Sequence, residues 1–114
     1  MGHPSRQVVA LLGDGDFLTV MQDMETAVRE NIGVTTIVFN DFGHGSIREI
    51  QRRDFGGRVV GSDSRDVPFG EFARLMGALG TRVTKPEEIA PALGPMLDSG
   101  KTALLEIAID PTKT

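Results

Sequence analysis

The sequence LLGDGDF at residues 11–17, together with VFNDFGHG at residues 38–45, decides the fold of this chain. Each stretch is an apolar run that ends abruptly in glycines and acidic residues. One amphipathic segment, residues 19–31, lies between them, so the predicted order is strand, turn, helix, strand, turn. In a parallel β-α-β unit the helix returns the chain, and both strands end at the same edge of the sheet.

A length estimate agrees with this placement of the two turns. A helix over residues 20–31 covers about 18 Å, and a strand over residues 34–40 covers about 23 Å. We therefore expect Asp14 and Asp41 to lie side by side, although they are far apart in the sequence. The carboxyl edge of an open parallel sheet is where ligands bind in such folds.

Length and composition narrow the class of protein. A chain of 114 residues predicts one domain, and with six Phe and no Trp or Tyr its core must be aliphatic. The net charge of −4 argues against a nucleic-acid partner. The absence of cysteine excludes a disulfide or thiolate site and fits the cytoplasm, which is the expected location. No apolar run approaches the roughly 18 residues that a membrane span needs.

The two ends of the chain are expected to lie outside the fold. Residues 1–5 lack the apolar centre of a signal peptide, so we expect an added or disordered start. Residues 112–114 are expected to form a tail, which leaves residues 6–111 as the domain.

The rest of the chain alternates between strands and helices. The first half predicts a fully buried strand at 7–12, a helix at 19–31 capped by Thr19 and ended by Gly33, a buried strand at 34–39 and a helix from Ser46 to Arg53. The second half predicts a loop at 54–68 with an extended piece at 58–60, a helix from Pro68 to Gly77 capped by Asp66, a strand at 81–83, a helix from Thr84 to Gly100 with a capping box, and a strand at 103–109. This order predicts an α/β protein with a parallel sheet and flanking helices. Because only about four strands are available around a first strand expected to be deeply buried, we expect a fragment of a larger domain.

The chemistry of the two turns favours a metal and phosphate site. Gly13-Asp14-Gly15 alone is equally compatible with a plain tight turn, but Asn40-Asp41 adds a second acidic turn at the same predicted edge. Two neighbouring carboxylates repel unless a cation lies between them, and Mg²⁺ takes one or two carboxylates together with phosphate oxygens and water. Glycine amides and helix N-termini suit a phosphate. The usual glycine-rich phosphate loops are not matched.

These residues resemble a known motif. VALLGDGDF at 9–17, ETAVREN at 25–31 and IVFND at 37–41 look like the thiamine-diphosphate motif, which runs from Gly-Asp-Gly to a paired Asn-Asn. The chain is similar to the C-terminal, diphosphate-binding domain of the acetolactate synthase and 2-oxoacid decarboxylase superfamily. The resemblance continues through residues 45–51, 69–76 and 86–107 and covers nearly all of the chain from Arg6 to Pro111.

The resemblance implies a thiamine diphosphate and Mg²⁺ site. Asp14 and Asp41 would bind the metal through their carboxylates, and Gly43 through its backbone carbonyl. Asp41 stands where the family more commonly has Asn, and its extra charge should tighten the metal but oppose the anion. No catalytic residue is predicted. The other residues expected at the cofactor are Gly13, Gly15, Asp16 and Phe17 in the first turn, and Asn40, which braces the second turn, with His44, Gly45 and Ser46 after it.

The resemblance also implies partners that this chain does not contain. In the family, a separate pyrimidine-binding domain, usually from a partner subunit, holds the other half of the cofactor. We therefore expect a pyrimidine-binding domain or subunit, a homo-oligomer, and a 2-oxoacid substrate in the complete enzyme. That enzyme would be a lyase or carboligase whose chemistry belongs to the cofactor, and this chain alone is expected to be inactive.

Three alternatives are open from the residues alone. Asp14 and Asp16 after a strand also fit a haloacid-dehalogenase-type phosphohydrolase, but Leu18 stands where that class has Thr or Val. A receiver-like signalling module would need a lysine after a late strand, and Lys85 and Lys101 precede a helix and a strand instead. The third alternative is a non-catalytic accessory module.

Several conspicuous side chains have simpler interpretations. His44 is as compatible with a solvated loop as with a ligand contact. Arg48, beside Glu49 on a helix, predicts a surface ion pair rather than a phosphate contact. The remaining side chains of this kind are Arg52, Arg53 and Arg58, expected on a solvated face, and Met21, Met24 and Met96, expected in the core.

Overall fold

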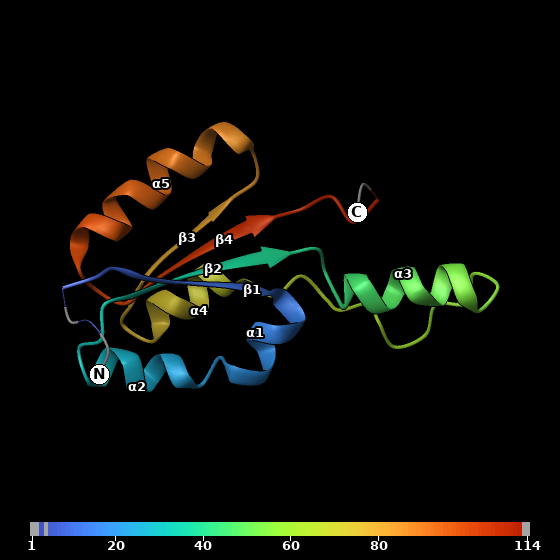
Figure 1. Cartoon of the computed structure of the whole chain (residues 1–114), viewed down its shortest axis with the longest axis horizontal. Helices are drawn as coiled ribbons and strands as arrows, with labels where there is room; N and C mark the ends of the chain where they lie inside the picture. Colours follow the sequence, from blue (N-terminus) through green and yellow to red (C-terminus); the bar gives the residue numbers. More distant parts are fainter. Residues whose placement is uncertain (1–2, 4, 113–114) are drawn as a thin grey trace.

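A computed structural model describes residue 3 and residues 5–112, and within them the chain forms an α/β fold. Four parallel strands pair in the order β1-β2-β4-β3 (Figure 1). The predicted fold class is therefore confirmed. The elements are β1 Val8–Gly13, α1 Asp14–Val20, α2 Asp23–Arg29, β2 Val34–Asn40, α3 Gly45–Asp54, α4 Phe69–Leu75, β3 Leu79–Val83, α5 Pro86–Ser99 and β4 Ala103–Ala108.

Helices cover the sheet unequally on its two faces. Helices α1, α2 and α4 lie on one face and α5 lies on the other, whereas α3 projects beyond the carboxyl ends of the strands (Figure 1). Two hydrophobic clusters result. The first contains Phe17, Met24, Val38, Phe69, Ala73 and Leu104, and the second contains Ile37, Val83, Met96, Ala103 and Leu105. Met24 and Met96 thus lie in the core, as predicted, and Met21 packs against it.

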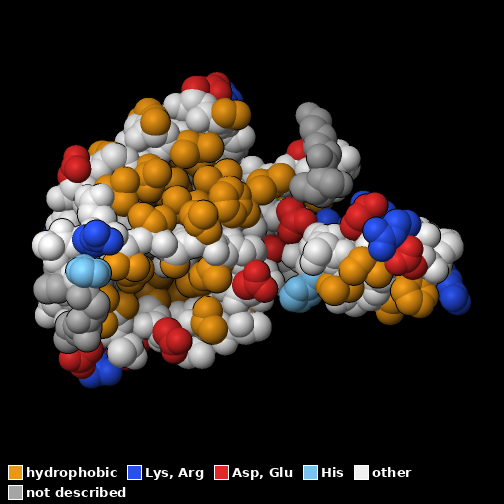
Figure 2. All heavy atoms as spheres, in the orientation of Figure 1, with side chains coloured by type: hydrophobic (Ala, Val, Ile, Leu, Met, Phe, Trp, Pro, Cys, Tyr) orange, Lys and Arg blue, Asp and Glu red, His pale blue; other side chains and the backbone are white. Residues whose placement is uncertain are grey.

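Strand β1 is less buried than its sequence predicts. Val8 and Leu11 are 56% and 64% exposed. In the described chain β1 pairs only with β2, and α5 packs mainly against β3 and β4. Figure 2 shows hydrophobic side chains gathered on the surface in this view, and β1 contributes Val8, Val9 and Leu11 to the exposed hydrophobic residues. The continuous apolar run therefore indicated a strand correctly but not its burial.

The first helix begins earlier than predicted. Gly13 is the extended N-cap residue of α1, so the helix starts at Asp14 instead of near Thr19. Thr19 is not a cap, because its hydroxyl donates to the carbonyl of Asp16. The predicted single helix is also split in two around Met21 and Gln22. Asp14 and Asp16 consequently occupy the first helical turn, where acidic side chains are favoured by the helix dipole.

Other boundaries differ by smaller amounts. Helix α2 ends at Arg29 and not at Gly33, since Asn31 takes a left-handed conformation (φ 54°). Residues 58–60 lie in a loop and form no strand, and after them an antiparallel bridge joins Gly43 to Asp63. The remaining helices, α3, α4 and α5, lie within two residues of their predicted starts.

The predicted helix caps are corrected in two places. Asp66 does not cap α4, because its carboxylate accepts from Arg82 at 2.7 Å while Pro68 is the N-cap residue. The capping box of α5 is present, but its N-cap residue is Lys85 and not Thr84. Of the predicted start and tail, residues 1, 2, 4, 113 and 114 lie outside the described residues. Among the described residues no helix has the length and apolar character needed to cross a membrane.

Candidate functional site

Asp14 lies where β1 turns into α1, and it joins the two predicted acidic turns. Its side chain is buried, with Oδ1 accepting from the Gly15 amide at 2.8 Å and Oδ2 accepting from the Gly43 amide at 2.7 Å. Burial raises the pKa of Asp14, the hydrogen bonds from Gly43 and Gly15 lower it, and the neighbouring Asp41 carboxylate raises it again. The Asp14 corner (residues 13–17) and the Asp41 loop (residues 40–45) therefore meet at one edge of the sheet.

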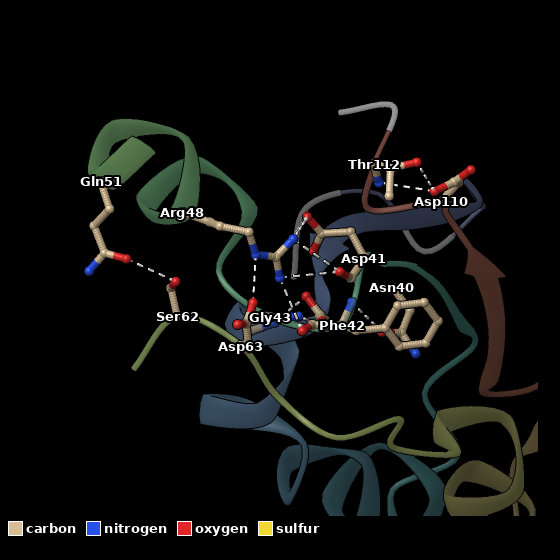
Figure 3. A network of polar contacts seen from close by, with 12 residues as sticks. Asn40, Asp41, Phe42, Gly43, Arg48, Gln51, Ser62, Asp63, Asp110 and Thr112 are labelled. Atoms are coloured by element: carbon tan, nitrogen blue, oxygen red, sulfur yellow. Dashed lines mark hydrogen bonds and ion pairs between the residues drawn. The ribbon is translucent and has the colours of Figure 1, made fainter. Parts of the chain in front are cut away.

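The Asp41 loop is held by side chains on both of its sides (Figure 3). Asn40 is fully buried, donates to Glu106 Oε1 at 2.8 Å and accepts from the Phe42 amide at 3.1 Å. Phe42 takes a left-handed conformation (φ 62°), which is uncommon outside glycine. Its carbonyl accepts from the Ser64 amide at 2.8 Å. Asn40 thus braces this turn in the structure, and the strained backbone marks the loop as a functional candidate.

Arg48 is the main departure from the predicted site. It is only 3% exposed, so it does not form the predicted surface pair with Glu49. Its Nε donates to Asp63 Oδ1 at 2.8 Å, its Nη2 donates to the Phe42 carbonyl at 3.1 Å, and its Nη1 lies 3.7 Å from Asp41 Oδ2 (Figure 3). Helical side chains point back toward the N-terminus, so an arginine one turn after a glycine-rich loop was a signal for this arrangement.

Glu106 is a second functional candidate that the sequence analysis missed. It lies fully buried on the central strand β4, where its Oε1 accepts from Asn40 and its Oε2 accepts from the Gly70 amide at 3.0 Å. Arg82 Nη1 approaches Glu106 Oε1 at 3.4 Å. A charged residue inside an otherwise apolar strand was the available signal, since buried carboxylates are rare without partners.

Two glycines let the corner and the loop approach closely. A Cβ atom at Gly15 would collide with the His44 ring, and one at Gly45 would collide with Asp41 Oδ2. His44 is exposed, and its ring lies against the backbone of Gly15. A side chain at either position would force His44 or Asp41 to move, and the two glycines leave backbone amides near the edge where the carboxylates meet.

The other predicted site residues differ in how exposed their side chains are. Asp16 is exposed on α1, and Ser46 is exposed in the first turn of α3. Phe17 points into the core, where its ring packs edge-on against Phe69 with centroids 5.5 Å apart. The Phe17 side chain therefore belongs to the core, and the expected place of this residue at the cofactor remains a prediction.

The donor set fits a hard cation next to phosphate. Among residue 3 and residues 5–112, no three His, Asp or Glu side chains gather as a metal cluster. Two facing carboxylates beside backbone amides match the way Mg²⁺ binds through one or two carboxylates while phosphate and water supply the other oxygens. A cation between Asp14 and Asp41 would also relieve the repulsion from Asp41, which adds to the effect of burial in raising the pKa of Asp14.

Comparison with known proteins identifies the family. A family model described as "Thiamine pyrophosphate enzyme, C-terminal TPP binding domain" matches residues 1–107. This chain belongs to that family. Thiamine diphosphate is the cofactor of the family and is used with Mg²⁺, so neither the phosphohydrolase nor the receiver-like alternative is favoured.

Individual members of the family match over nearly the whole chain. YdaP of Bacillus subtilis (strain 168), whose name describes it as thiamine pyrophosphate-containing, is 35% identical over 109 residues, which are 96% of this chain and 19% of YdaP. The sulfoacetaldehyde acetyltransferase of Alcaligenes xylosoxydans xylosoxydans is 34% identical over 91% of this chain and 18% of its own. The chain thus spans about a fifth of the length of the curated relatives it matches.

A solved family structure has the same fold. The thiamine diphosphate-dependent 4-hydroxybenzoylformate decarboxylase of Rhodococcus jostii RHA1 superposes with a TM-score of 0.87 at 27% identity. The superposition covers 94% of this chain and 20% of that one. The parallel sheet and its helices are therefore those of the C-terminal domain of this family.

Proposed function

We propose that this chain binds the diphosphate and Mg²⁺ end of thiamine diphosphate, as part of a 2-oxoacid decarboxylase or carboligase. The observation that supports this most directly is the 2.7 Å hydrogen bond from the Gly43 amide to Asp14, which joins the Asp14 corner to the Asp41 loop. It brings the two carboxylates of the motif together at the carboxyl edge of the sheet, where ligands bind in α/β folds.

The residues have distinct proposed roles. Asp14 and Asp41 would hold the metal through carboxylate oxygens and Gly43 through its carbonyl. The amides at Gly15, Asp16, Gly45 and Ser46 would face the diphosphate, favoured by the positive ends of α1 and α3. When bound, the cofactor supplies the carbanion-stabilising chemistry, while this chain fixes its anionic end.

The reaction of the complete enzyme is proposed only at the level of its class. The relatives include acetolactate synthase, whose large subunit IlvG of Mycobacterium tuberculosis is 31% identical over 112 residues, together with an acetyltransferase and a decarboxylase. We propose a 2-oxoacid substrate, a pyrimidine-binding domain or subunit as partner, a homo-oligomeric assembly and a cytoplasmic location. Since the chain spans a fifth of these relatives, we propose that it is inactive by itself.

Calorimetric titration tests this proposal. Thiamine diphosphate is titrated into the 114-residue chain with saturating Mg²⁺, and again with EDTA in place of the metal. We expect binding only with Mg²⁺, and no binding of thiamine, which lacks the diphosphate. Binding that is unchanged by EDTA, or equal for thiamine, would contradict the proposal.

A further inference from the structure

We propose that Arg48 is a positioning residue that neutralises Asp41, and that this lets a site with two carboxylates accept an anionic diphosphate. The inference rests on the proposed function, because it concerns the same site. It assigns a role to a buried side chain that is not a ligand of the metal or of the diphosphate. It also explains how the site can contain Asp41, whose charge would otherwise oppose the cofactor.

The contacts of Arg48 show that it serves the Asp41 loop. Its Nη1 lies 3.7 Å from Asp41 Oδ2, and its two terminal nitrogens lie 3.4 Å from the Asp41 carbonyl. A further bond of 3.1 Å reaches the Phe42 carbonyl. One guanidinium thus contacts a charge and two successive carbonyls of the loop, which suits the rigid fork of an arginine better than a lysine.

Burial makes the pair with Asp41 matter more than the shorter pair with Asp63. The side chain of Arg48 is 4% exposed and that of Asp41 is 14% exposed, whereas that of Asp63 is 71% exposed. Water and salt screen a charge as exposed as Asp63. The Arg48–Asp41 interaction is largely shielded from that screening, although its distance is longer.

The charges at the edge of the sheet then balance differently with and without Arg48. Asp14 and Asp41 together match the two positive charges of Mg²⁺, which leaves no attraction for the diphosphate from the metal site as a whole. With Arg48 offsetting Asp41, the site retains one net positive charge once the metal is bound. We therefore expect Arg48 to support cofactor affinity through charge and, separately, to hold the loop through its bonds to the carbonyls.

A double-mutant cycle separates the charge from the geometry. Thiamine diphosphate is titrated calorimetrically at saturating Mg²⁺ into the wild type, Arg48→Gln, Asp41→Asn and the double variant of the same chain. Arg53→Gln is the matched control, because it removes the same charge from the same helix at a side chain that is 65% exposed. Arg48→Lys keeps the charge but cannot make the same fork of hydrogen bonds. Urea unfolding of all variants reports their stability without cofactor.

The inference predicts a specific pattern of affinities. Arg48→Gln should weaken binding by about tenfold or more, whereas in the Asp41→Asn background the same change should cost only about twofold, because less charge is left to neutralise. Arg48→Lys should bind better than Arg48→Gln, and Arg53→Gln should stay within about twofold of the wild type.

Other outcomes would overturn the inference. If Arg48→Gln caused the same loss of affinity in the wild type as in the Asp41→Asn background, Arg48 would act on structure alone. If the effects of the Arg48 and Asp41 substitutions were non-additive in urea unfolding but additive in cofactor affinity, Arg48 would likewise act on structure alone. If the wild type binds no cofactor with Mg²⁺, the proposed function fails and this inference fails with it. If the wild type binds normally but the effects of the Arg48 and Asp41 substitutions on affinity are additive, only this inference fails.

Discussion

The Asp14 corner and the Asp41 loop each contribute one carboxylate to the proposed site, but they are built differently. Asp14 follows a strand directly and opens a helix, and both of its carboxylate oxygens accept from backbone amides. The Asp41 loop contains a strained Phe42 and depends on side chains from α3 and β4. The corner is therefore defined mainly by local sequence, with one hydrogen bond from the loop, whereas the loop depends on side chains from two other elements.

This difference has a functional consequence. The corner positions its carboxylate mainly through the strand-to-helix turn and the Gly15 amide, and its single distant contact is the hydrogen bond from the Gly43 amide. The loop can change its charge or its position when Arg48 or Glu106 changes, since these residues fix it from outside. We infer that the corner sets whether the metal binds and that the loop adjusts how well metal and diphosphate bind together.

The largest expected effect comes from the corner. Asp14→Ala removes a buried carboxylate that no other side chain can replace, so Mg²⁺-dependent binding of thiamine diphosphate should fall by more than about a hundredfold. Calorimetry measures the loss, and circular dichroism checks that the variant is folded. Retention of wild-type affinity would refute the assignment of Asp14 as a metal ligand.

The corresponding change in the loop should be mild. Asp41→Asn keeps an oxygen at the same position and removes one charge, so cofactor affinity should stay within about fivefold of the wild type. The same titration measures it. A loss as large as that of Asp14→Ala would mean that the two carboxylates are equivalent and would remove the contrast between corner and loop.

A change in β4 should test the support of the loop. Glu106→Gln puts an amide where both carboxylate oxygens accept hydrogen bonds, so a donor would face either Asn40 or the Gly70 amide. We expect a loss of about 1–3 kcal/mol in the free energy of unfolding, measured by urea denaturation. Cofactor affinity should also fall, but less than in Asp14→Ala, because Asn40 only braces the turn.

The exposed Glu71→Gln on α4 is the matched control for this experiment. A surface substitution of this kind should change stability by no more than about 0.5 kcal/mol. If Glu106→Gln were as neutral as this control, the buried contacts to Asn40 and Gly70 would have no role in holding the loop.

The sequence predicts the corner better than the loop for physical reasons. An apolar run that ends in glycine and aspartate indicates where a strand ends. Because consecutive parallel strands end at the same edge of the sheet, Asp14 is then expected near Asp41. The position of Arg48 one turn after the loop is a signal that it points back toward the loop carbonyls, but the neighbouring Glu49 favours a surface pair, and Asp63 comes close only in the fold. The exposure of β1 was unpredictable in the same way, since an apolar strand gives no information about which neighbours cover it.

The segment after α3 should respond to a smaller change. Gln51 donates to the Val60 carbonyl at 2.9 Å and accepts from the Val60 amide at 3.2 Å and from the Ser62 hydroxyl at 3.0 Å. Gln51→Ala should release this segment locally and speed hydrogen exchange at the Val60 amide by about fivefold, which corresponds to about 1 kcal/mol. Exchange in β2 and β4 should be unchanged. Glu49→Ala, an exposed change on the same helix, is the control.

If Gln51→Ala also weakened cofactor binding strongly, the Asp41 loop would depend on the whole projecting segment and not only on Arg48. We expect a loss of less than about threefold, because the residues adjoining the loop in this segment, Asp63 and Ser64, keep their own bonds to Arg48 and Phe42. The measurement therefore shows how far support for the loop extends along the chain.

The smallest expected effect lies in the capping box of α5, which follows β3, the strand that β4 separates from β2. Glu88 Oε2 accepts from the Thr84 amide at 2.9 Å and from the Lys85 amide at 3.2 Å. The Thr84 hydrogen bond is the main reason that the pKa of Glu88 lies below its ordinary value, with the amide and charge of Lys85 acting in the same direction. The folded state therefore favours the ionised carboxylate.

The sign of the pH effect follows from this lowered pKa. The unfolded chain binds the proton more readily, so the stabilisation by Glu88 is present above its unfolded pKa and is lost as the pH falls through the folded value. Glu88→Gln should lower the thermal midpoint slightly at pH 7 and reduce its fall between about pH 5 and pH 3. Glu87→Gln is the matched control, because it removes the same charge from the next position on α5, while Glu88 is the residue that accepts from the Thr84 and Lys85 amides. Cofactor affinity at pH 7 should be the same in both variants, because the bonds of Glu88 go to the Thr84 and Lys85 amides and not to the corner or the loop. A change in affinity would show that the site is coupled to the start of α5.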